Sequence, residues 1–165
     1  ATTDFNTLPQ VSKTILVMLM FVGACAGSTG GGIKVSRFVI LLKTINKELH
    51  HFLHPKAVRK ISMDGKVVEH EVVRSINVFM IAYVLIFSFS VLLVGFDNQD
   101  LVTNFTAVAA TLNNIGPGLE MVGPAQNFGL FSNGAKCVLI FDMLAGRLEI
   151  FPLLILFVRD TWKKF

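Results

Sequence analysis

Thr111-Leu112-Asn113-Asn114-Ile115-Gly116-Pro117-Gly118 is the stretch that decides the fold of this 165-residue chain. From Asn114 onward it runs polar, aliphatic, glycine, ring, glycine. Glycine reaches positive φ values at little cost, so Gly116 and Gly118 allow successive carbonyl oxygens to turn to one side. Carbonyl oxygens arranged in this way can replace the water around a cation. The same composition also suits an ordinary turn, so the flanking segments have to decide between a turn and an ion filter.

Apolar segments flank this stretch on both sides. Residues 72–95 carry only Arg74 near their start and predict a transmembrane span. Residues 98–112 predict a helix that is too short to span a membrane, with its N-cap among Asp97–Asp100. The negative end of its dipole would face the stretch and favour a cation there. Residues 135–158 predict a second span, so the order is span, re-entrant pore helix, filter at residues 113–118, span.

The composition places the chain among all-α membrane proteins. It is 53% hydrophobic and 16% charged, with fifteen Phe and a mean hydropathy of +0.63. Nine of the fifteen Lys and Arg residues lie between Lys34 and Arg74, and three more close the C-terminus at Arg159, Lys163 and Lys164. Basic residues beside membrane segments predict cytoplasmic loops and a cytoplasmic C-terminus, in contact with lipid and not with nucleic acid. Cys25 and Cys137 sit in separate apolar segments, and we expect two buried free thiols.

The first apolar region predicts a transmembrane helix that is broken in its middle. A continuous helix from Pro9 to Leu53 would be about 67 Å long, more than twice the hydrocarbon thickness of a membrane. The segment Gly27-Ser28-Thr29-Gly30-Gly31-Gly32, here called the glycine loop, cannot hold a helix well. Non-helical backbone at this depth has to be buried in protein or to line a watery cavity, which favours a functional role. The chain has no initiator Met and no signal peptide, so we expect it to begin inside a longer protein.

Two soluble-protein interpretations of these segments are weaker. A phosphate-binding loop needs Gly-Lys in direct succession, whereas Ile33 separates Gly32 from Lys34. His50 and His54 share a helical face, so a metal site that includes His51 is an alternative, but no Cys or carboxylate joins the cluster. A solvated end of an interfacial helix explains these three histidines better.

The remaining segments connect or complete the two spans. Residues 55–71 predict a cytoplasmic hairpin around Asp64-Gly65, which is a strong two-residue turn signal. The last span carries three charges, at Asp142, Arg147 and Glu149, together with two potential kink residues, Gly146 and Pro152. Charges in a span are costly, and they usually face a cavity or a partner. Asp142 and Glu149 share a face, and Arg147 lies about 140° away from Asp142. We therefore expect Arg147 to face a pore, with ion pairing inside the bundle as the alternative for the two acids.

Several motifs together carry a resemblance to a known family: residues 23–35 around the glycine loop, His54-Pro55-Lys56-Ala57-Val58, Ala110–Gly118, and Gly146-Arg147-Leu148-Glu149. They resemble the bacterial Trk-type potassium transporters of the TrkH/KtrB/HKT superfamily, over essentially the whole chain. In that family one chain carries four pore units around a central axis. The resemblance implies that residues 1–54 are the second helix of the third unit, broken near 23–32. It implies that residues 72–165 are the whole fourth unit.

The resemblance also implies roles for individual residues. Asn113, Asn114, Ile115, Gly116, Pro117 and Gly118 would form the ion filter, with K⁺ at Asn114, Ile115 and Gly116. The glycine loop, Gly27, Ser28, Thr29, Gly30, Gly31 and Gly32, would act as a gate, with Arg147 near it. The partners implied are the remaining pore units, a second copy in a homodimer and a cytosolic nucleotide-binding regulatory subunit of the TrkA/KtrA type. The location implied is the bacterial inner membrane, with several passes.

Potassium uptake through a gated pore is therefore the expected function, with K⁺ as the transported ion, no organic cofactor and no enzymatic step. Pro117 and Asn114 replace the Tyr and Thr of potassium-channel filters, so a less selective K⁺/Na⁺ transporter or a cation-channel subunit is the alternative. Both channel-like permeation and symport driven by H⁺ or Na⁺ fit this pattern. A membrane enzyme is less favoured because no Ser/His, HExxH or paired-acid arrangement lies at membrane depth. A purely structural subunit would not need an internal filter.

Overall fold

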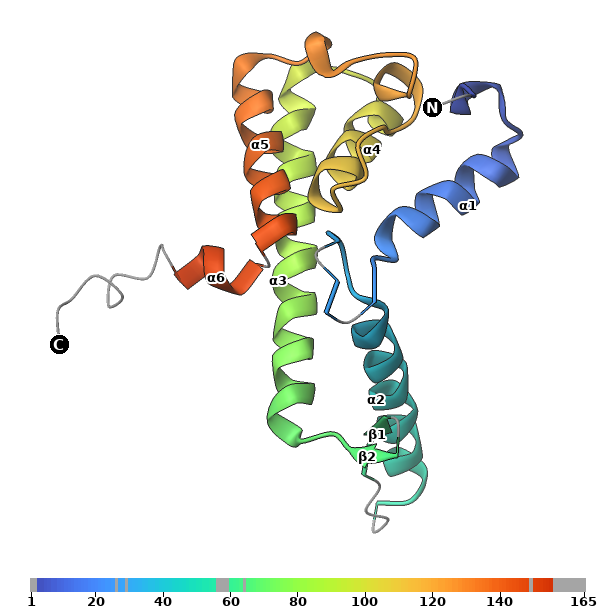
Figure 1. Ribbon diagram of the computed structural model, residues 1–165, viewed down its shortest axis with the longest axis vertical. Helices are drawn as coiled ribbons and strands as arrows, with labels where there is room; N and C mark the ends of the chain where they lie inside the picture. Colours follow the sequence, from blue (N-terminus) through green and yellow to red (C-terminus); the bar gives the residue numbers. More distant parts are fainter. Residues whose placement is uncertain are drawn as a thin grey trace, which may run out of the picture.

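One long helix, α3 (His70–Val94), runs along the molecule, and the other helices pack beside it (Figure 1). The computed structural model describes residues 3–25, 27–28, 30–55, 60–63, 65–148 and 150–155. Before α3 come η1 (Phe5–Thr7), α1 (Gln10–Phe21), α2 (Val35–Leu53), β1 (Ser62–Met63) and β2 (Lys66–Val67). After it come η2 (Gly95–Asp97), α4 (Leu101–Leu112), η3 (Glu120–Val122), η4 (Phe128–Leu130), α5 (Asn133–Leu148) and α6 (Ile150–Ile155).

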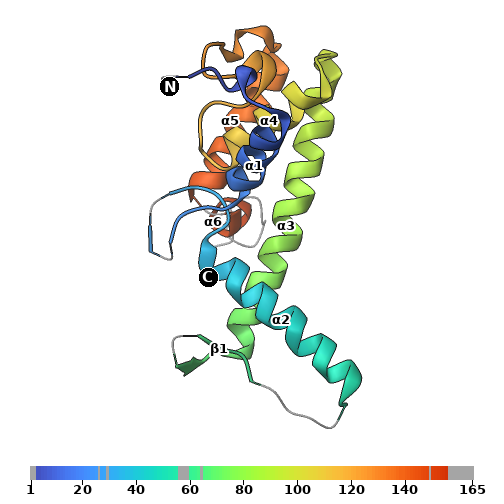
Figure 2. The ribbon, with the colours of Figure 1, turned by 90° about the vertical axis from the view of Figure 1, so that its right-hand side faces the viewer.

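The composition of α3 suits a membrane span. Among the described residues, His70–Asp97 is the one helical stretch that is both long and apolar enough to cross a membrane. Its outer half packs against α4 and α5, and its inner half packs against α2 (Figures 1 and 2). The same helix therefore supports both α4, which leads into residues 113–118, and α2 at the opposite end of the molecule.

Helix α4 is the most deeply buried element. Asp100 is its N-cap, with Oδ2 accepting a hydrogen bond from the Val102 N–H at 2.9 Å. The helix starts at Leu101, three residues later than expected, because Asn98 takes a left-handed conformation with φ of 53°. Nine of its twelve residues are buried, since α1, α3 and α5 surround it. A core cluster of Val94, Ala107, Val108, Val122, Phe131, Ala135 and Leu139 holds this helix in place.

The predicted cytoplasmic connection contains a much smaller hairpin than residues 55–71. Two-residue strands pair antiparallel, Ser62 with Val67 and Met63 with Lys66. The hairpin is attached to two helices: Lys43 Nζ of α2 donates to the Ser62 carbonyl at 2.7 Å, and Ile61 packs with Ile40, Val73 and Ile76. The turn residue Asp64 and residues 56–59 lie outside the described residues.

The last span differs from the continuous helix expected over residues 135–158. It consists of α5 and α6, and α6 leaves the bundle at a steep angle (Figure 1). Pro152 explains the division, because it has no N–H for the Leu148 carbonyl and its ring would clash with that carbonyl in a continuous helix. In α6 the same proline occupies the first turn, where an N–H has no intrahelical partner. Glu149 and residues 156–165, with their three basic side chains, lie outside the described residues.

The two cysteines are free, as expected, but they are not buried. Cys25 and Cys137 are both exposed on the chain. Their apolar sequence context predicted burial because a span usually packs against protein or lipid. Here they lie on faces that the described residues leave uncovered.

Candidate functional site

Residues 113–118, the predicted ion filter, are called the filter stretch here. Two of them, Asn114 and Gly116, have a left-handed backbone conformation. Asn114 has φ of 54° and Gly116 has φ of 106°, and both values lie in the region that favours glycine. Asn is one of the few other residues that tolerates such a conformation. Ile115 and Gly116 are exposed, and Asn114 and Pro117 are partly exposed. This segment therefore presents Asn114, Ile115 and Gly116, the residues expected to bind the ion, on an open face.

The exit of the filter is held by packing and hydrogen bonds. The Gly118 N–H donates to the Val122 carbonyl at 2.7 Å, and the Leu119 N–H donates to Thr106 Oγ1 at 3.0 Å. A Cβ on Gly118 would lie 2.7 Å from Val122 Cγ2 and 2.9 Å from Thr106 Oγ1. Gly118 is therefore needed for space, whereas Gly116 has nothing within 4 Å of a built Cβ and is needed for its φ.

Asn113, the first residue of the predicted filter, directs its side chain into the protein. Its side chain is buried, with Oδ1 accepting from Tyr83 Oη at 2.9 Å and Nδ2 donating to the Ala109 carbonyl at 2.8 Å. The Asn113 side chain is thus bound to Tyr83 and to the α4 backbone, away from the exposed face of residues 114–117. The next residue, Asn114, donates from Nδ2 to the Met143 carbonyl at 3.1 Å and joins the filter to α5.

The C-terminal end of α4 is largely closed by the turn that follows it. The carbonyls of Ala109, Ala110 and Thr111 accept the N–H groups of Asn113, Ile115 and Asn114, respectively. These bonds fold the filter stretch back onto the helix end. The helix dipole still directs its negative end towards this turn, which favours a cation close to it.

The glycine loop lies against the base of the filter. Its arms are joined by a parallel bridge between Val22 and Ile33 and by the Gly23 N–H, which donates to the Ile33 carbonyl at 2.9 Å. A Cβ on Gly31 would lie 2.8 Å from the Asn113 carbonyl oxygen, and one on Gly32 would lie 2.9 Å from Asn113 Oδ1. The loop therefore touches the filter through backbone alone. Gly27 and Gly32 have positive φ, and Thr29 lies outside the described residues.

Gly146 brings α5 against the end of α4. A Cβ at this position would overlap the carbonyl oxygen of Leu112 and would lie 2.7 Å from Asn114 Nδ2. The sequence suggested a kink at Gly146. Its position in the structure instead provides the space for a close helix contact next to the filter.

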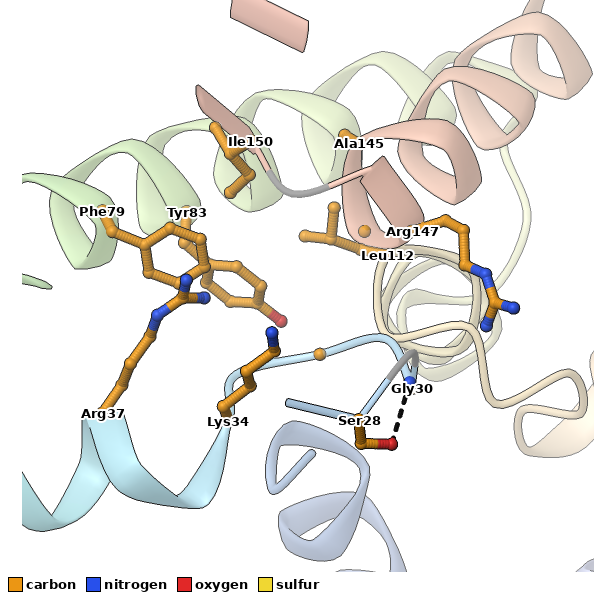
Figure 3. A pocket seen from close by; sticks show the side chains of 12 residues that line it. Ser28, Gly30, Lys34, Arg37, Phe79, Tyr83, Leu112, Ala145, Arg147 and Ile150 are labelled. Atoms are coloured by element: carbon orange, nitrogen blue, oxygen red, sulfur yellow. Dashed lines mark hydrogen bonds between the residues drawn. The ribbon is translucent and has the colours of Figure 1, made fainter. Parts of the chain in front are cut away.

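A cavity of about 50 Å³ lies below the filter, between the glycine loop and the helices (Figure 3). This volume can hold a small number of water molecules. Ser28 and Gly30 line it, Lys34 and Arg37 enter it from the start of α2, and Arg147 extends from α5 on the other side (Figure 3). Arg37 stacks on Phe79, with Cζ 3.9 Å from the ring centroid.

Arg147 therefore lines the same cavity as Ser28 and Gly30 of the glycine loop. Its side chain is exposed, and among the described residues it makes no hydrogen bond or ion pair. Asp142 is fully buried instead, with Oδ1 accepting from Ser90 Oγ at 2.7 Å. The two charges of α5 thus have separate surroundings.

The outer side of the filter is joined to the start of the chain. Asn6 and Glu120 exchange two hydrogen bonds: Asn6 Nδ2 donates to the Glu120 carbonyl at 3.0 Å, and the Glu120 N–H donates to Asn6 Oδ1 at 2.9 Å. Lys13 on α1 lies 3.6 Å from Glu120 Oε1. The outer end of α1 is therefore fixed to the loop that follows the filter.

Sequence reasoning missed several residues of this site. Lys34 and Arg37 were counted only among the basic residues beside a membrane segment, and they line the cavity with Arg147. Tyr83 was not singled out, although it is the single Tyr in a chain with fifteen Phe, which is a signal for a required hydroxyl.

Among the described residues, no group of three or more His, Cys, Asp or Glu is arranged to hold a metal ion. His50 and His54 face each other with ring centroids 5.0 Å apart.

Comparison with known proteins gives consistent matches over the whole chain. A family model described as TrkH, cation transport protein, matches residues 1–164. The Trk system potassium uptake protein TrkH of Vibrio parahaemolyticus serotype O3:K6 is 44% identical over 162 residues, covering 98% of this chain and 33% of the relative. The Trk system potassium uptake protein TrkG of Escherichia coli K12 is 38% identical over 163 residues, covering 99% of this chain and 33% of the relative.

A solved structure has the same fold. The crystal structure of the potassium transporter TrkH from Vibrio parahaemolyticus superposes with a TM-score of 0.84 at 44% sequence identity, covering 94% of this chain and 33% of that chain. This similarity confirms the expected all-α membrane fold. The chain spans about a third of the length of the relatives it matches.

Proposed function

Because this chain belongs to the TrkH cation transport protein family, we propose that it forms the fourth pore unit, and the end of the third, of a protein that takes up K⁺ through a gated pore. The observation that carries the proposal is the left-handed backbone at both Asn114 and Gly116, on an open face at the C-terminal end of a buried short helix. K⁺ is bound by backbone carbonyls of Asn114, Ile115 and Gly116 and is not chemically changed. The family relatives are named as potassium uptake proteins, which supports K⁺ as the cargo.

The glycine loop is the gate of this pore. Its backbone touches Asn113 and Asn114, and it forms one wall of the cavity below them. Lys34, Arg37 and Arg147 all line that cavity, so a K⁺ ion leaving the filter meets positive charge there. In a region of low dielectric such charges raise the barrier for a cation considerably. Removing one of them lowers that barrier.

Rb⁺ uptake by the full-length transporter that contains this chain, expressed in a cell that lacks its own K⁺ uptake, tests both ideas. Wild-type protein should restore uptake. Arg147→Ala should raise uptake several-fold per membrane-inserted molecule, because it removes a cation from the exit path. Arg74→Ala makes the same change on an exposed part of α3 away from the cavity, and it should leave uptake unchanged. Wild-type protein that inserts without transporting Rb⁺ contradicts the transport function. Unchanged flux per molecule in Arg147→Ala contradicts the role of Arg147 alone.

The regulatory partner is a cytosolic nucleotide-binding subunit that acts on the hairpin side. The hairpin is attached to α2 through Lys43 and to α3 through Val73 and Ile76. Helix α2 begins two residues after Ile33 and close to the glycine loop, and its N-cap Lys34 and its residue Arg37 line the cavity. A force applied to the hairpin is therefore transmitted along α2 to the gate.

A second copy of the protein packs on the exposed stripe of α2. Leu42, Ile45, Leu49 and Phe52 are 64%, 49%, 60% and 84% exposed. They follow one another at intervals of three, four and three residues, the spacing of a helix–helix seam. An apolar stripe of this kind is costly to leave in water, which supports the homodimer.

The protein lies in the bacterial inner membrane, with the hairpin and the C-terminus in the cytosol. In a variant without Cys25 and Cys137, Ser62→Cys in the hairpin should resist a membrane-impermeant thiol reagent applied to intact cells. Ala125→Cys, in the exposed turn after the filter, should react with it. Permeabilised cells should label both variants. Labelling of Ser62→Cys alone in intact cells would reverse the orientation.

A further inference from the structure

A buried pair, Tyr83 and Asn113, lies where α3, the end of α4 and the glycine loop meet. Tyr83 and Asn113 are 5% and 4% exposed, and Tyr83 Oη lies 2.9 Å from Asn113 Oδ1. On the other side of the amide, Asn113 Nδ2 lies 2.8 Å from the Ala109 carbonyl. A carbonyl can only accept, so this contact fixes which way the amide faces. The Tyr83 hydroxyl is therefore the donor to Asn113 Oδ1.

The amide that receives this bond also contacts the two functional segments. Asn113 is the residue that ends α4, and the left-handed Asn114 of the filter follows it directly. Gly32 packs so closely on Asn113 that a Cβ there would lie 2.9 Å from Oδ1. Asn113 Oδ1 thus accepts a hydrogen bond from Tyr83 on one side and contacts Gly32 of the glycine loop on another. A displacement of this oxygen would move the filter base, the loop or both.

The hydroxyl is the only part of Tyr83 that packing alone does not explain. Tyr83 belongs to a cluster in which Phe79 also packs, so an apolar ring suits this part of the core. A hydroxyl placed there without a partner would be unfavourable, because burial removes its hydrogen bonds to water. Its bond to Asn113 is what makes Tyr favourable over Phe at this position.

We propose that Tyr83 is a positioning residue for the ion filter: its hydroxyl sets the Asn113 side chain, and through it the turn into Asn114 and the contact with the glycine loop. This inference rests on the proposed function, because the property it controls is ion selectivity. It adds a residue of α3, thirty positions before Asn113 in the sequence, to a site otherwise built from the filter stretch, the glycine loop and α5.

The test is the ratio of Rb⁺ to Na⁺ uptake per inserted molecule of the full-length transporter that contains this chain. Tyr83→Phe keeps the ring and removes the hydroxyl, leaving Asn113 Oδ1 buried without its donor. The ratio should fall about fivefold, the size of effect expected from one lost buried hydrogen bond. Ser90→Ala is the matched control, because it removes the other buried hydroxyl of α3 that donates to a side-chain acceptor, Asp142. It should lower the amount of folded protein without changing the ratio.

A second pair of variants shows whether Tyr83 acts through Asn113. Asn113→Leu should lower the ratio by itself, and adding Tyr83→Phe to it should cause no further fall, because residues in one network are not additive. The double variant also removes both polar partners together, which costs less folding stability than removing one. It therefore remains measurable even if Tyr83→Phe alone inserts poorly.

The outcomes separate this inference from the proposed function. Rb⁺ uptake by wild-type protein with an unchanged ratio in Tyr83→Phe overturns the positioning role and leaves the transport function standing. A ratio that falls equally in Tyr83→Phe and Ser90→Ala overturns it too, since the effect would then be a general one of α3. Wild-type protein that inserts without any Rb⁺ uptake overturns both.

Discussion

Gly146→Ala is expected to remove most of the folded protein from the membrane, and the Rb⁺ uptake with it. The added Cβ would overlap the Leu112 carbonyl oxygen, which belongs to backbone and cannot rotate away. Relief requires α5 to move away from α4, which also breaks the bond from Asn114 Nδ2 to the Met143 carbonyl. Overpacking of this kind costs about 3 kcal/mol, a large part of the stability of an ordinary domain. Inserted, folded protein should therefore fall more than about tenfold.

Gly134→Ala provides the matched control, because Gly134 lies in the first turn of the same helix. The nearest atom to a Cβ there is Ser132 Oγ at 3.8 Å, which is an ordinary contact. Alanine is also the better helix former, so this variant should match or slightly exceed wild-type levels. The amount of membrane-inserted protein, measured by detergent extraction and size-exclusion chromatography, compares the two. Equal amounts of both variants would contradict the close α4–α5 contact.

Gly116→Ser is expected to abolish most of the preference for Rb⁺ over Na⁺ while leaving the protein in the membrane. A built Cβ meets nothing within 4 Å, so the substitution causes no clash. The φ of 106° is the difficulty, since a side chain there costs about 1–3 kcal/mol and the backbone relaxes to avoid it. The carbonyls of Ile115 and Gly116 would then turn, and the uptake ratio should fall more than about tenfold, whereas the amount of protein stays within about twofold.

Gly95→Ser separates backbone strain from the mere presence of a side chain. Gly95 is equally open, with nothing within 4 Å of a built Cβ, but its φ of −60° suits any residue. Uptake of both ions should match that of the wild-type protein. If Gly116→Ser also kept the wild-type ratio, the residues around Gly116 would not form the filter.

The features that could be predicted from the sequence are those that depend on neighbouring residues. The short helix before Asn113 followed from length and capping residues, and the break at the glycine loop followed from glycines that cannot hold a helix. The division between α5 and α6 was only partly foreseen. Pro152 indicated a kink, whereas the structure has two helices with different directions (Figure 1).

The features that were missed depend on how distant segments cross. Gly146 contacts Leu112 only because α5 passes close to the end of α4, and nothing in the residues around Gly146 specifies that crossing. Tyr83 and Asn113 are separated by thirty residues, so no local pattern could pair them. The exposure of Cys25 is likewise set by what packs beside it. The residue types predicted the backbone conformations of the site, whereas the contacts between its segments could be found only in the folded structure.

The attachment of Asn6 and Lys13 to Glu120 fixes the N-terminal end of α1. That end lies beside the loop after residues 113–118, while the other end, at Phe21, is joined to the glycine loop by residues 22–26. A swing of α1 about the fixed end would move its inner end most and its outer end least. In the proposed gating mechanism, the glycine loop can therefore be displaced while the loop after the filter keeps its place, so ions outside would meet the same entrance whether the pore is open or shut.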